Sequence, residues 1–88
     1  MPTVTVTHKT EAEKKLRAQI LLSQMVVTND PVRRSVAAFA KRVGVSRQYI
    51  YRCMDEGRCT AELASRLQKI FGAAAAPIDE LCWSKVNN

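Results

Sequence analysis

The segment from Val36 to Asp55 constrains the fold most, because its residues have the spacing of a helix-turn-helix. Ala40, four residues before Gly44, provides a small side chain where a second helix would cross the first. Gly44 provides a turn residue that adopts positive φ without steric cost. Ile50 and Cys53 continue an apolar stripe into the second helix, so the long polar side chains of that helix would face outward. We therefore expect two helices joined by a tight turn at Gly44.

The outer face of the second helix is expected to bind double-stranded DNA. Its outward side chains are Ser46, Arg47, Gln48, Tyr51 and Arg52. In the major groove, arginine pairs bidentately with guanine and glutamine with adenine, which makes Arg47, Gln48 and Arg52 the expected base contacts. Tyr51 would touch a thymine methyl group or a phosphate, and Ser46, besides capping the helix, would donate to a phosphate. The alternative is that all five are ordinary solvated residues of a surface helix.

Positive charge is concentrated over the same part of the chain. The whole chain has a formal net charge of +6, and the stretch from Arg33 to Arg58 holds seven cations against two anions, Asp55 and Glu56. A basic surface is typical of nucleic-acid-binding proteins, although cationic side chains on the outer faces of helices can also be there only because water solvates them. Because the charge here coincides with the motif, it favours DNA binding.

Cations outside the second helix are expected to contact phosphates. Arg33 and Arg34 directly precede Ser35, which would cap the first motif helix, so side chains and backbone amides together would clamp a phosphate. Arg58 would meet the DNA backbone from the loop that follows the motif. Phosphate contact and simple solvation remain equally open for the two cations within the first motif helix, Lys41 and Arg42.

The 88 residues suit one small all-α domain of four to five helices that contains the helix-turn-helix motif. The expected N-caps are Thr10, Ser35, Ser46 and Thr60. The helices they open should run to about Val27, Val43, Met54 and Phe71, and a short last segment should cover Pro77 to Trp83. This domain would span residues 10–83, between a flexible N-terminal arm at 1–9 and a frayed tail at 84–88.

Two apolar surfaces remain to be covered. The first helix is expected to bury one face, which carries Leu16, Ile20, Leu21 and Met25 and is widened by Leu22 and Val26. The last segment offers a candidate dimer interface formed by Ile78, Leu81 and Trp83, with the exposed side of the first helix as an additional surface. The alternative is that these three residues cover the core of their own domain.

The sequence gives no support for an enzyme, a metal site or a cofactor. Its three cysteines form no CxxC pair, and its only histidine, His8, lies in the N-terminal arm, so about four zinc ligands cannot be assembled. Catalytic residues and phosphate-cradling glycines are also missing. An odd number of cysteines without a signal peptide indicates reduced thiols in a cytoplasmic protein. No apolar run approaches the roughly 20 residues that cross a membrane.

Residues from about 31 to 83 resemble the Cro-like branch of the lambda-repressor-like helix-turn-helix proteins, and most nearly the small YdaS-type regulators of phages and prophages. The resemblance rests on the segment VAAFAKRVGVSRQYIYRCMDEGR, with its GVS turn, and on the segments TAELASRLQKIFG and PIDELCW that follow. Two features depart from the pattern. The helix from Glu11 to Val27 is longer than the pattern needs, and Cys53-Met54 stands where a tryptophan often ends the recognition helix.

The resemblance implies a bacterial or phage transcription regulator, a repressor that binds a palindromic DNA operator as a homodimer in the cytoplasm of its bacterial host, at the nucleoid. Arg47, Gln48, Tyr51 and Arg52 match the DNA-reading positions of that family. The main alternative is a protein-interaction module, a phage or antitoxin-like protein that binds a host protein or a toxin. RNA binding is less favoured, because only two of the five aromatic residues, Tyr49 and Tyr51, lie in the second motif helix.

Overall fold

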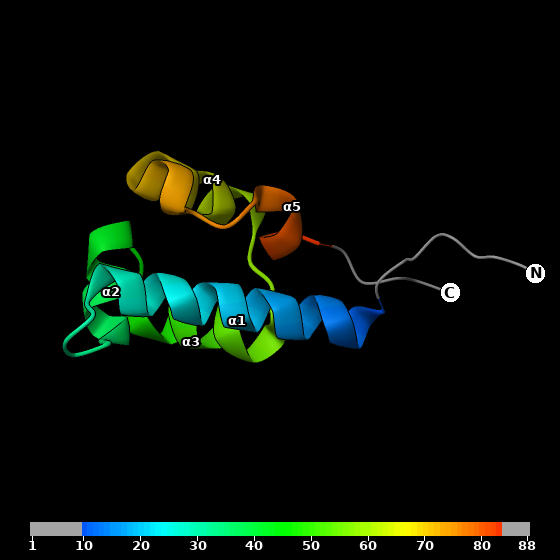
Figure 1. Ribbon diagram of the computed structural model, residues 1–88, viewed down its shortest axis with the longest axis horizontal. Coiled ribbons are helices and arrows are strands. Elements are labelled where there is room, and N and C mark those ends of the chain that lie inside the picture. The colour runs from blue at the N-terminus through cyan, green and yellow to red at the C-terminus, as the bar shows by residue number, and fades with distance from the viewer. Residues whose placement is uncertain (1–9, 84–88) are drawn as a thin grey trace, which may run out of the picture.

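The computed structural model describes residues 10–83, which form five α-helices and one 3₁₀ turn (Figure 1). The α-helices are α1 (Glu11–Asn29), α2 (Val36–Val43), α3 (Arg47–Glu56), α4 (Ala61–Phe71) and α5 (Ile78–Leu81), and the 3₁₀ turn η1 covers Gly72–Ala74. The arm expected at residues 1–9 and the tail expected at 84–88 lie outside the described residues.

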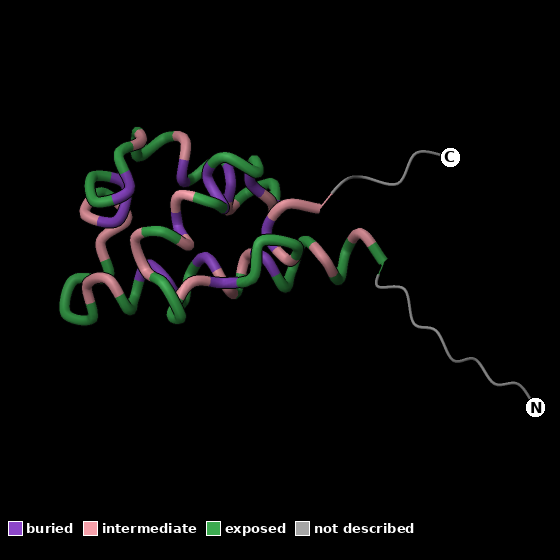
Figure 2. The backbone as a smooth tube through the Cα atoms, turned by 90° about the horizontal axis from the view of Figure 1, so that it is seen from above, coloured by how far each residue is buried: buried purple, intermediate pink, exposed green. Residues whose placement is uncertain are grey.

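The longest helix, α1, runs beside α3 in the opposite direction, while α2 lies at one end of the pair and α4 and α5 lie on the other side of α1 (Figure 1). The side-chain amide of Gln19 in α1 donates to the backbone oxygen of Met54 near the end of α3, at 2.9 Å. All five α-helices contribute buried apolar residues, and Figure 2 marks the buried positions along the backbone. The largest of these are Phe39, Leu22, Ile50, Leu67 and Leu81.

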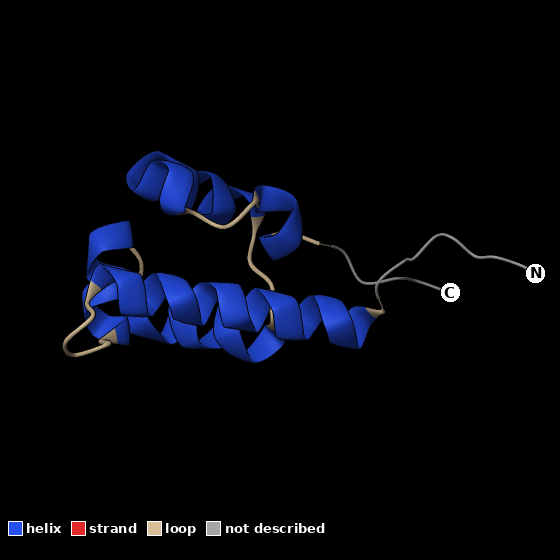
Figure 3. Ribbon diagram, viewed as in Figure 1, coloured by secondary structure: helices blue, strands red, loops and turns tan. Residues whose placement is uncertain are grey.

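The predicted all-α fold is confirmed, since every regular element within residues 10–83 is helical (Figure 3). All four predicted N-caps are confirmed as well. The hydroxyls of Thr10, Ser35, Ser46 and Thr60 each accept a hydrogen bond from the backbone N–H three residues later, at 3.0–3.2 Å. The carboxylate of Glu13 completes a capping box by accepting from the Thr10 N–H at 2.9 Å. Helix α1 ends at Asn29, two residues later than predicted.

The buried face predicted for α1 is wrong in part. Leu16 is 58% exposed and Ile20 43% exposed, whereas α1 buries Ala18, Leu22, Met25 and Val26. Both stripes are apolar, so helical periodicity alone cannot choose between them. The buried stripe contains the small residue Ala18, a side chain that leaves room for a neighbouring helix to approach α1 closely.

The dimer interface predicted on the last segment is also wrong in part. Leu81 is fully buried in the core of its own domain, so it has no surface to offer a second copy. Trp83 is half-buried, and its indole N–H donates to the backbone oxygen of Gly57 at 2.8 Å. Ile78 alone remains among the exposed large apolar residues. The alternative, in which this segment covers its own core, therefore holds for Leu81 and in part for Trp83.

The three thiols are unpaired, and two of them, Cys53 and Cys59, are buried. Burial raises the pKa of the Cys59 thiol to about 12, and the neighbouring Cys53 and Cys82 add to this effect. Burial also raises the pKa of Cys53, with a smaller contribution from the nearby Glu56 carboxylate.

Among α1 to α5, none combines the length and the apolar character that a membrane-crossing helix requires.

Candidate nucleic-acid interface

A three-residue turn, Gly44 to Ser46, joins α2 to α3 in the way that the sequence predicts. Gly44 adopts the left-handed conformation with φ +89°, and the N–H groups of Gly44 and Val45 both donate to the backbone oxygen of Ala40, at 2.8 and 3.0 Å. These bonds satisfy one of the carbonyl groups near the end of α2. Ala40 itself is buried where the two helices meet. The turn therefore fixes the direction in which α3 leaves α2.

Helix α4 supports this turn from outside the motif. The guanidinium of Arg66 donates to the backbone oxygen of Val43, the last residue of α2, at 3.3 Å. A cation at the C-terminus of a helix is stabilised by the helix dipole. Arg66 also lies 3.7 Å from the carboxylate of Glu62, one turn earlier in α4. The partner of Arg66 in α2 is 23 residues away along the chain, so no local sequence pattern indicates this contact.

The first two turns of α3 present the predicted side chains to solvent. Arg47, Gln48 and Tyr51 are exposed, as is Arg52, whereas Ile50 and Cys53 on the opposite face are buried. Because the inner face packs against α1 and α2, the outer side chains project from a backbone that the core holds in place. The predicted orientation of α3 is thus confirmed.

Charge is unevenly distributed along the outer face of α3. Arg47 lies at the first helical position and Arg52 in the second turn, while Asp55 and Glu56 occupy the last turn. The guanidinium of Arg52 reaches the Glu56 carboxylate at 3.5 Å, although both side chains remain largely in solvent. An exposed pair of this kind contributes little to stability. The beginning of α3, where the helix dipole is also positive, is therefore the end suited to an anion.

The turn between α1 and α2 adds two further cations at the same end of the molecule as the beginning of α3 (Figure 1). The carboxylate of Asp30 accepts from the Arg33 N–H at 3.1 Å, and its backbone oxygen accepts from the Arg34 N–H at 2.7 Å. Arg34 has φ +54°, a left-handed conformation that costs a non-glycine residue energy. Both arginines are exposed, and neither forms an ion pair within residues 10–83. Helix α2, about 12 Å long, separates this turn from α3.

This turn also exposes a residue that the sequence analysis left without a role. Val32 is 91% exposed, directly before Arg33 and Arg34. An apolar side chain so fully in solvent is a candidate contact for a partner, but a single exposed valine is also common on protein surfaces. In the sequence, only its position after Pro31 and before two arginines indicated that Val32 would be exposed.

Two of the basic residues are held by contacts within the domain. Arg58 lies over the Trp83 ring at 5.6 Å and lines a hollow with Asp55 and Glu56. It is therefore placed beyond the acidic end of α3, away from Arg47. Arg42 donates to the Asn29 side-chain oxygen at 2.9 Å, and its guanidinium lies 4.6 Å from the centre of the Phe71 ring. Phosphate contact is not needed to explain either position.

Tyr49, the other aromatic residue of the motif, faces the domain and not the outer surface of α3. It is half-buried, and its hydroxyl pairs with that of Thr60 at 3.1 Å. This contact joins α3 to the residue that caps α4. Tyr49 therefore belongs to the packing of the motif.

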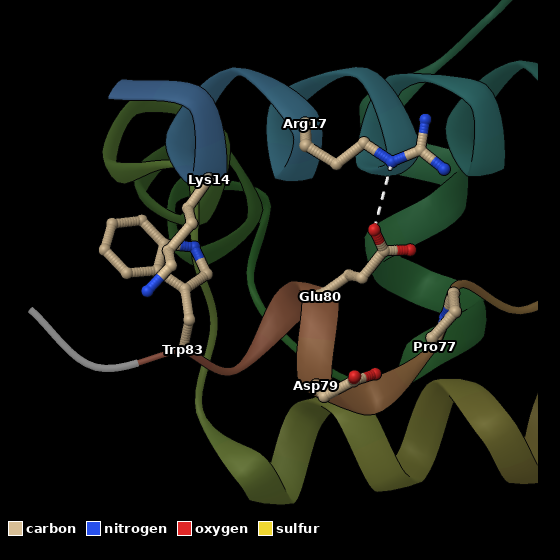
Figure 4. A pocket seen from close by; sticks show the side chains of 6 residues that line it. All are labelled: Lys14, Arg17, Pro77, Asp79, Glu80 and Trp83. Atoms are coloured by element: carbon tan, nitrogen blue, oxygen red, sulfur yellow. Dashed lines mark hydrogen bonds and ion pairs between the residues drawn. The ribbon is translucent and has the colours of Figure 1, made fainter. Parts of the chain in front are cut away.

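A concave site lies between α1 and α5 (Figure 4). It has a volume of about 500 Å³ and is lined by Lys14, Arg17, Pro77, Asp79, Glu80 and Trp83. An ion pair of 3.2 Å joins Arg17 and Glu80 across it, and the Lys14 ammonium lies 5.9 Å from the Trp83 ring. Within the described part of the chain, no group of three or more histidine, cysteine, aspartate or glutamate residues could hold a metal ion. The outer face of α3, which presents Arg47, Gln48 and Tyr51 to solvent, remains the candidate nucleic-acid interface.

Comparison with known proteins finds no match to this chain among protein-family models, curated proteins or solved structures.

Proposed function

We propose that this chain is a sequence-specific double-stranded-DNA-binding protein that acts as a transcriptional regulator, a repressor of the Cro-like phage or prophage type. One observation carries the proposal: Arg47, Gln48 and Tyr51 are exposed together on the first two turns of a helix whose other face is buried. A DNA-binding helix needs side chains with hydrogen-bonding ends that project from a fixed backbone into the major groove.

In the proposed complex, α3 enters the major groove with its N-terminal end first. Arg47 pairs with guanine O6 and N7, and Gln48 with adenine N6 and N7. Tyr51 packs against a thymine methyl group or donates to a phosphate. Arg52 follows one turn later, and it must exchange its solvent-exposed contact with Glu56 for the base. That exchange is inexpensive, because an exposed ion pair is typically worth less than about 1 kcal/mol.

Phosphate contacts would orient the domain on the duplex. Arg33 and Arg34 extend from the turn before α2, and the N-terminus of α2 lies directly behind them with Ser35 as its cap. Backbone N–H groups at a helix N-terminus bind anions, and nearby arginines add charge-assisted bonds. Contacts of this kind position a protein on DNA without distinguishing sequences.

A homodimer on a palindromic operator is part of the proposal. A single recognition helix contacts only a few base pairs, whereas two copies bound to half-sites about one helical turn apart double the number of specific contacts. A regulator of this type would act in the cytoplasm of a bacterial host, at the nucleoid.

The proposal is tested by selecting bound duplexes from a random pool at two salt concentrations. We expect enrichment of a palindromic sequence and a log–log salt slope of roughly −0.9 for each phosphate contacted. Arg47→Ala should abolish the enrichment at one base position. Lys69→Ala, which removes the same charge from the exposed surface of α4, is the matched control and should retain it. Absence of binding even at low salt would overturn the proposal.

A protein-interaction module is the second candidate, because α1 exposes the apolar residues Leu16, Ile20 and Val27. In this case a host protein or a toxin would be the partner. Binding to such a partner should depend on salt much less steeply than binding to DNA, because no condensed counterions are released.

A further inference from the structure

The outer face of α1 carries an apolar stripe that nothing within residues 10–83 covers. Leu16, Ile20 and Val27 are 58%, 43% and 38% exposed, and together with the exposed Ser23 they follow one another at intervals of four, three and four residues. This is the spacing of the first and fourth positions of a heptad, which form the narrow seam along which two helices pack. The stripe lies on the side of α1 opposite to Leu22 and Met25, which face the core.

We infer that this stripe binds the same stripe of a second copy of the chain, with the two α1 helices antiparallel about a two-fold axis. An axis midway between Leu21 and Leu22 brings Leu16 of each copy opposite Val27 of the other. It also brings Ile20 of each copy opposite the small Ser23 of the other. The surface beside Ser23 is a shallow hollow lined by Gln19, Ile20, Ser23, Gln24, Val27 and Thr28, which can receive the Ile20 side chain of the second copy. One stripe therefore carries both the projecting residue and the hollow that an isologous interface requires.

The distribution of charge agrees with pairing between identical copies. Between Leu16 and Val27 the only charged residue is Arg17, whose guanidinium already forms an ion pair with Glu80 at 3.2 Å. Two copies can therefore meet along this stretch without bringing unpaired like charges together. Because α3 packs on the inner side of α1, the outer face of α3 stays uncovered in such a dimer.

The stripe is smaller than the interface of a stable dimer. Its twelve residues give a footprint about 18 Å long and about 10 Å wide, on the order of 200 Å² per copy, well below the ~800 Å² per partner of a standard interface. Each free copy also carries a net charge of +6, which opposes association. The contact is therefore weak in free solution. DNA neutralises the charge and holds two copies close together, so on DNA the contact appears as cooperativity between half-sites. This last step rests on the proposed function.

The test compares Ile20→Glu with Ser65→Glu, which introduces the same charge at an exposed position of α4. On duplexes taken from the random-pool selection, wild-type protein and Ser65→Glu should bind two half-sites more tightly than independent sites predict, by about tenfold or more. Ile20→Glu should lose this factor and keep its affinity for a single half-site. Unchanged cooperativity in Ile20→Glu would overturn the inference.

Sedimentation equilibrium of the free proteins separates this inference from the proposed function, because it needs no DNA. A weak dimer of the wild type that is lost in Ile20→Glu and retained in Ser65→Glu would support the α1 interface even if no duplex is bound. Wild-type protein that remains monomeric up to millimolar concentration, together with an absence of cooperativity on DNA, would overturn it.

Discussion

The indole N–H of Trp83 donates a 2.8 Å hydrogen bond to the backbone oxygen of Gly57, which connects the segment after α5 to the residue that ends α3. Gly57 adopts the left-handed conformation with φ +71°, and its N–H and that of Arg58 donate to the Cys53 oxygen at 2.8 and 3.2 Å. With the Gln19 side chain also bound to Met54, the C-terminal end of α3 is held from two directions. The N-terminal end, by contrast, is held by its cap and by the turn.

Replacement of Trp83 should test this arrangement. Trp83→Phe keeps most of the apolar contact but removes the N–H donor, so we expect unfolding free energy to fall by about 1 kcal/mol. Trp83→Ala also removes the ring beneath Lys14 and Arg58, and should cost about 2 kcal/mol or more. Urea denaturation followed by far-UV circular dichroism measures both. Ile78→Ala, at an exposed position of α5, should change stability by no more than about 0.5 kcal/mol. Equal stability of Trp83→Phe and wild type would show that the hydrogen bond contributes nothing.

Alanine at Gly57 and at Gly44 should have different effects, although both glycines have positive φ. A Cβ atom at Gly44 would have the Arg66 guanidinium as its nearest neighbour, at an ordinary 3.6 Å, so only the conformational cost of about 1–2 kcal/mol applies. A Cβ atom at Gly57 would lie 2.7 and 2.8 Å from backbone atoms of Lys15 in α1. Gly57→Ala should therefore be clearly the more destabilising in thermal denaturation. A larger loss in Gly44→Ala would contradict the close approach of α1 and α3.

Alkaline pH should destabilise the domain through Cys59. The thiol has an ordinary pKa of 9.0 when exposed in the unfolded chain and about 12 in the folded domain. Because the folded state favours the protonated thiol, its contribution is fully present below pH 9 and is lost as the pH rises from 9 toward 12. Urea midpoints of wild type and Cys59→Ala should therefore converge between about pH 7 and about pH 10. Midpoints that stay equally far apart would contradict this linkage.

Arg42 should contribute to stability and not to DNA binding. Arg42→Ala removes the hydrogen bond to Asn29 and the contact with the Phe71 ring, and should lower the unfolding free energy by about 1 kcal/mol. If the protein binds DNA as proposed, the salt slope of Arg42→Ala should match that of Lys69→Ala. A decrease of about one unit in that slope relative to Lys69→Ala would show that Arg42 contacts a phosphate.

Replacing a residue that contacts a base should change the sequence preference of binding, whereas replacing one that contacts a phosphate should not. Arg47→Ala and Gln48→Ala should each cost about 1–3 kcal/mol on the selected operator and relax the preference at one base position. Arg33→Ala should weaken all sequences alike and reduce the salt slope by about one. Competition binding with single-base operator variants distinguishes the two classes. Unchanged affinity and preference in Gln48→Ala would remove its proposed base contact.

Local features of this fold were predictable, whereas contacts between distant segments were not. The four capping hydroxyls bind backbone groups three residues away, and the positive φ of Gly44 follows from its own turn, so both leave a signal in a short stretch of sequence. The buried face of α1 depends on which helices pack against it, and two apolar stripes fit the same periodicity. Arg42 and Arg58 looked like free cations because their partners, Phe71 and Trp83, are far along the chain.

Because α3 has one buried and one exposed face, amino-acid substitutions can accumulate on the exposed face during evolution. Ile50 and Cys53 hold the helix in the core, while Arg47, Gln48 and Tyr51 make no contact that the core requires. Substitutions at exposed helical positions usually alter stability by no more than about 0.5 kcal/mol. The three outer residues can therefore be exchanged with little effect on folding, and a new binding preference could arise without a compensating change elsewhere in the domain.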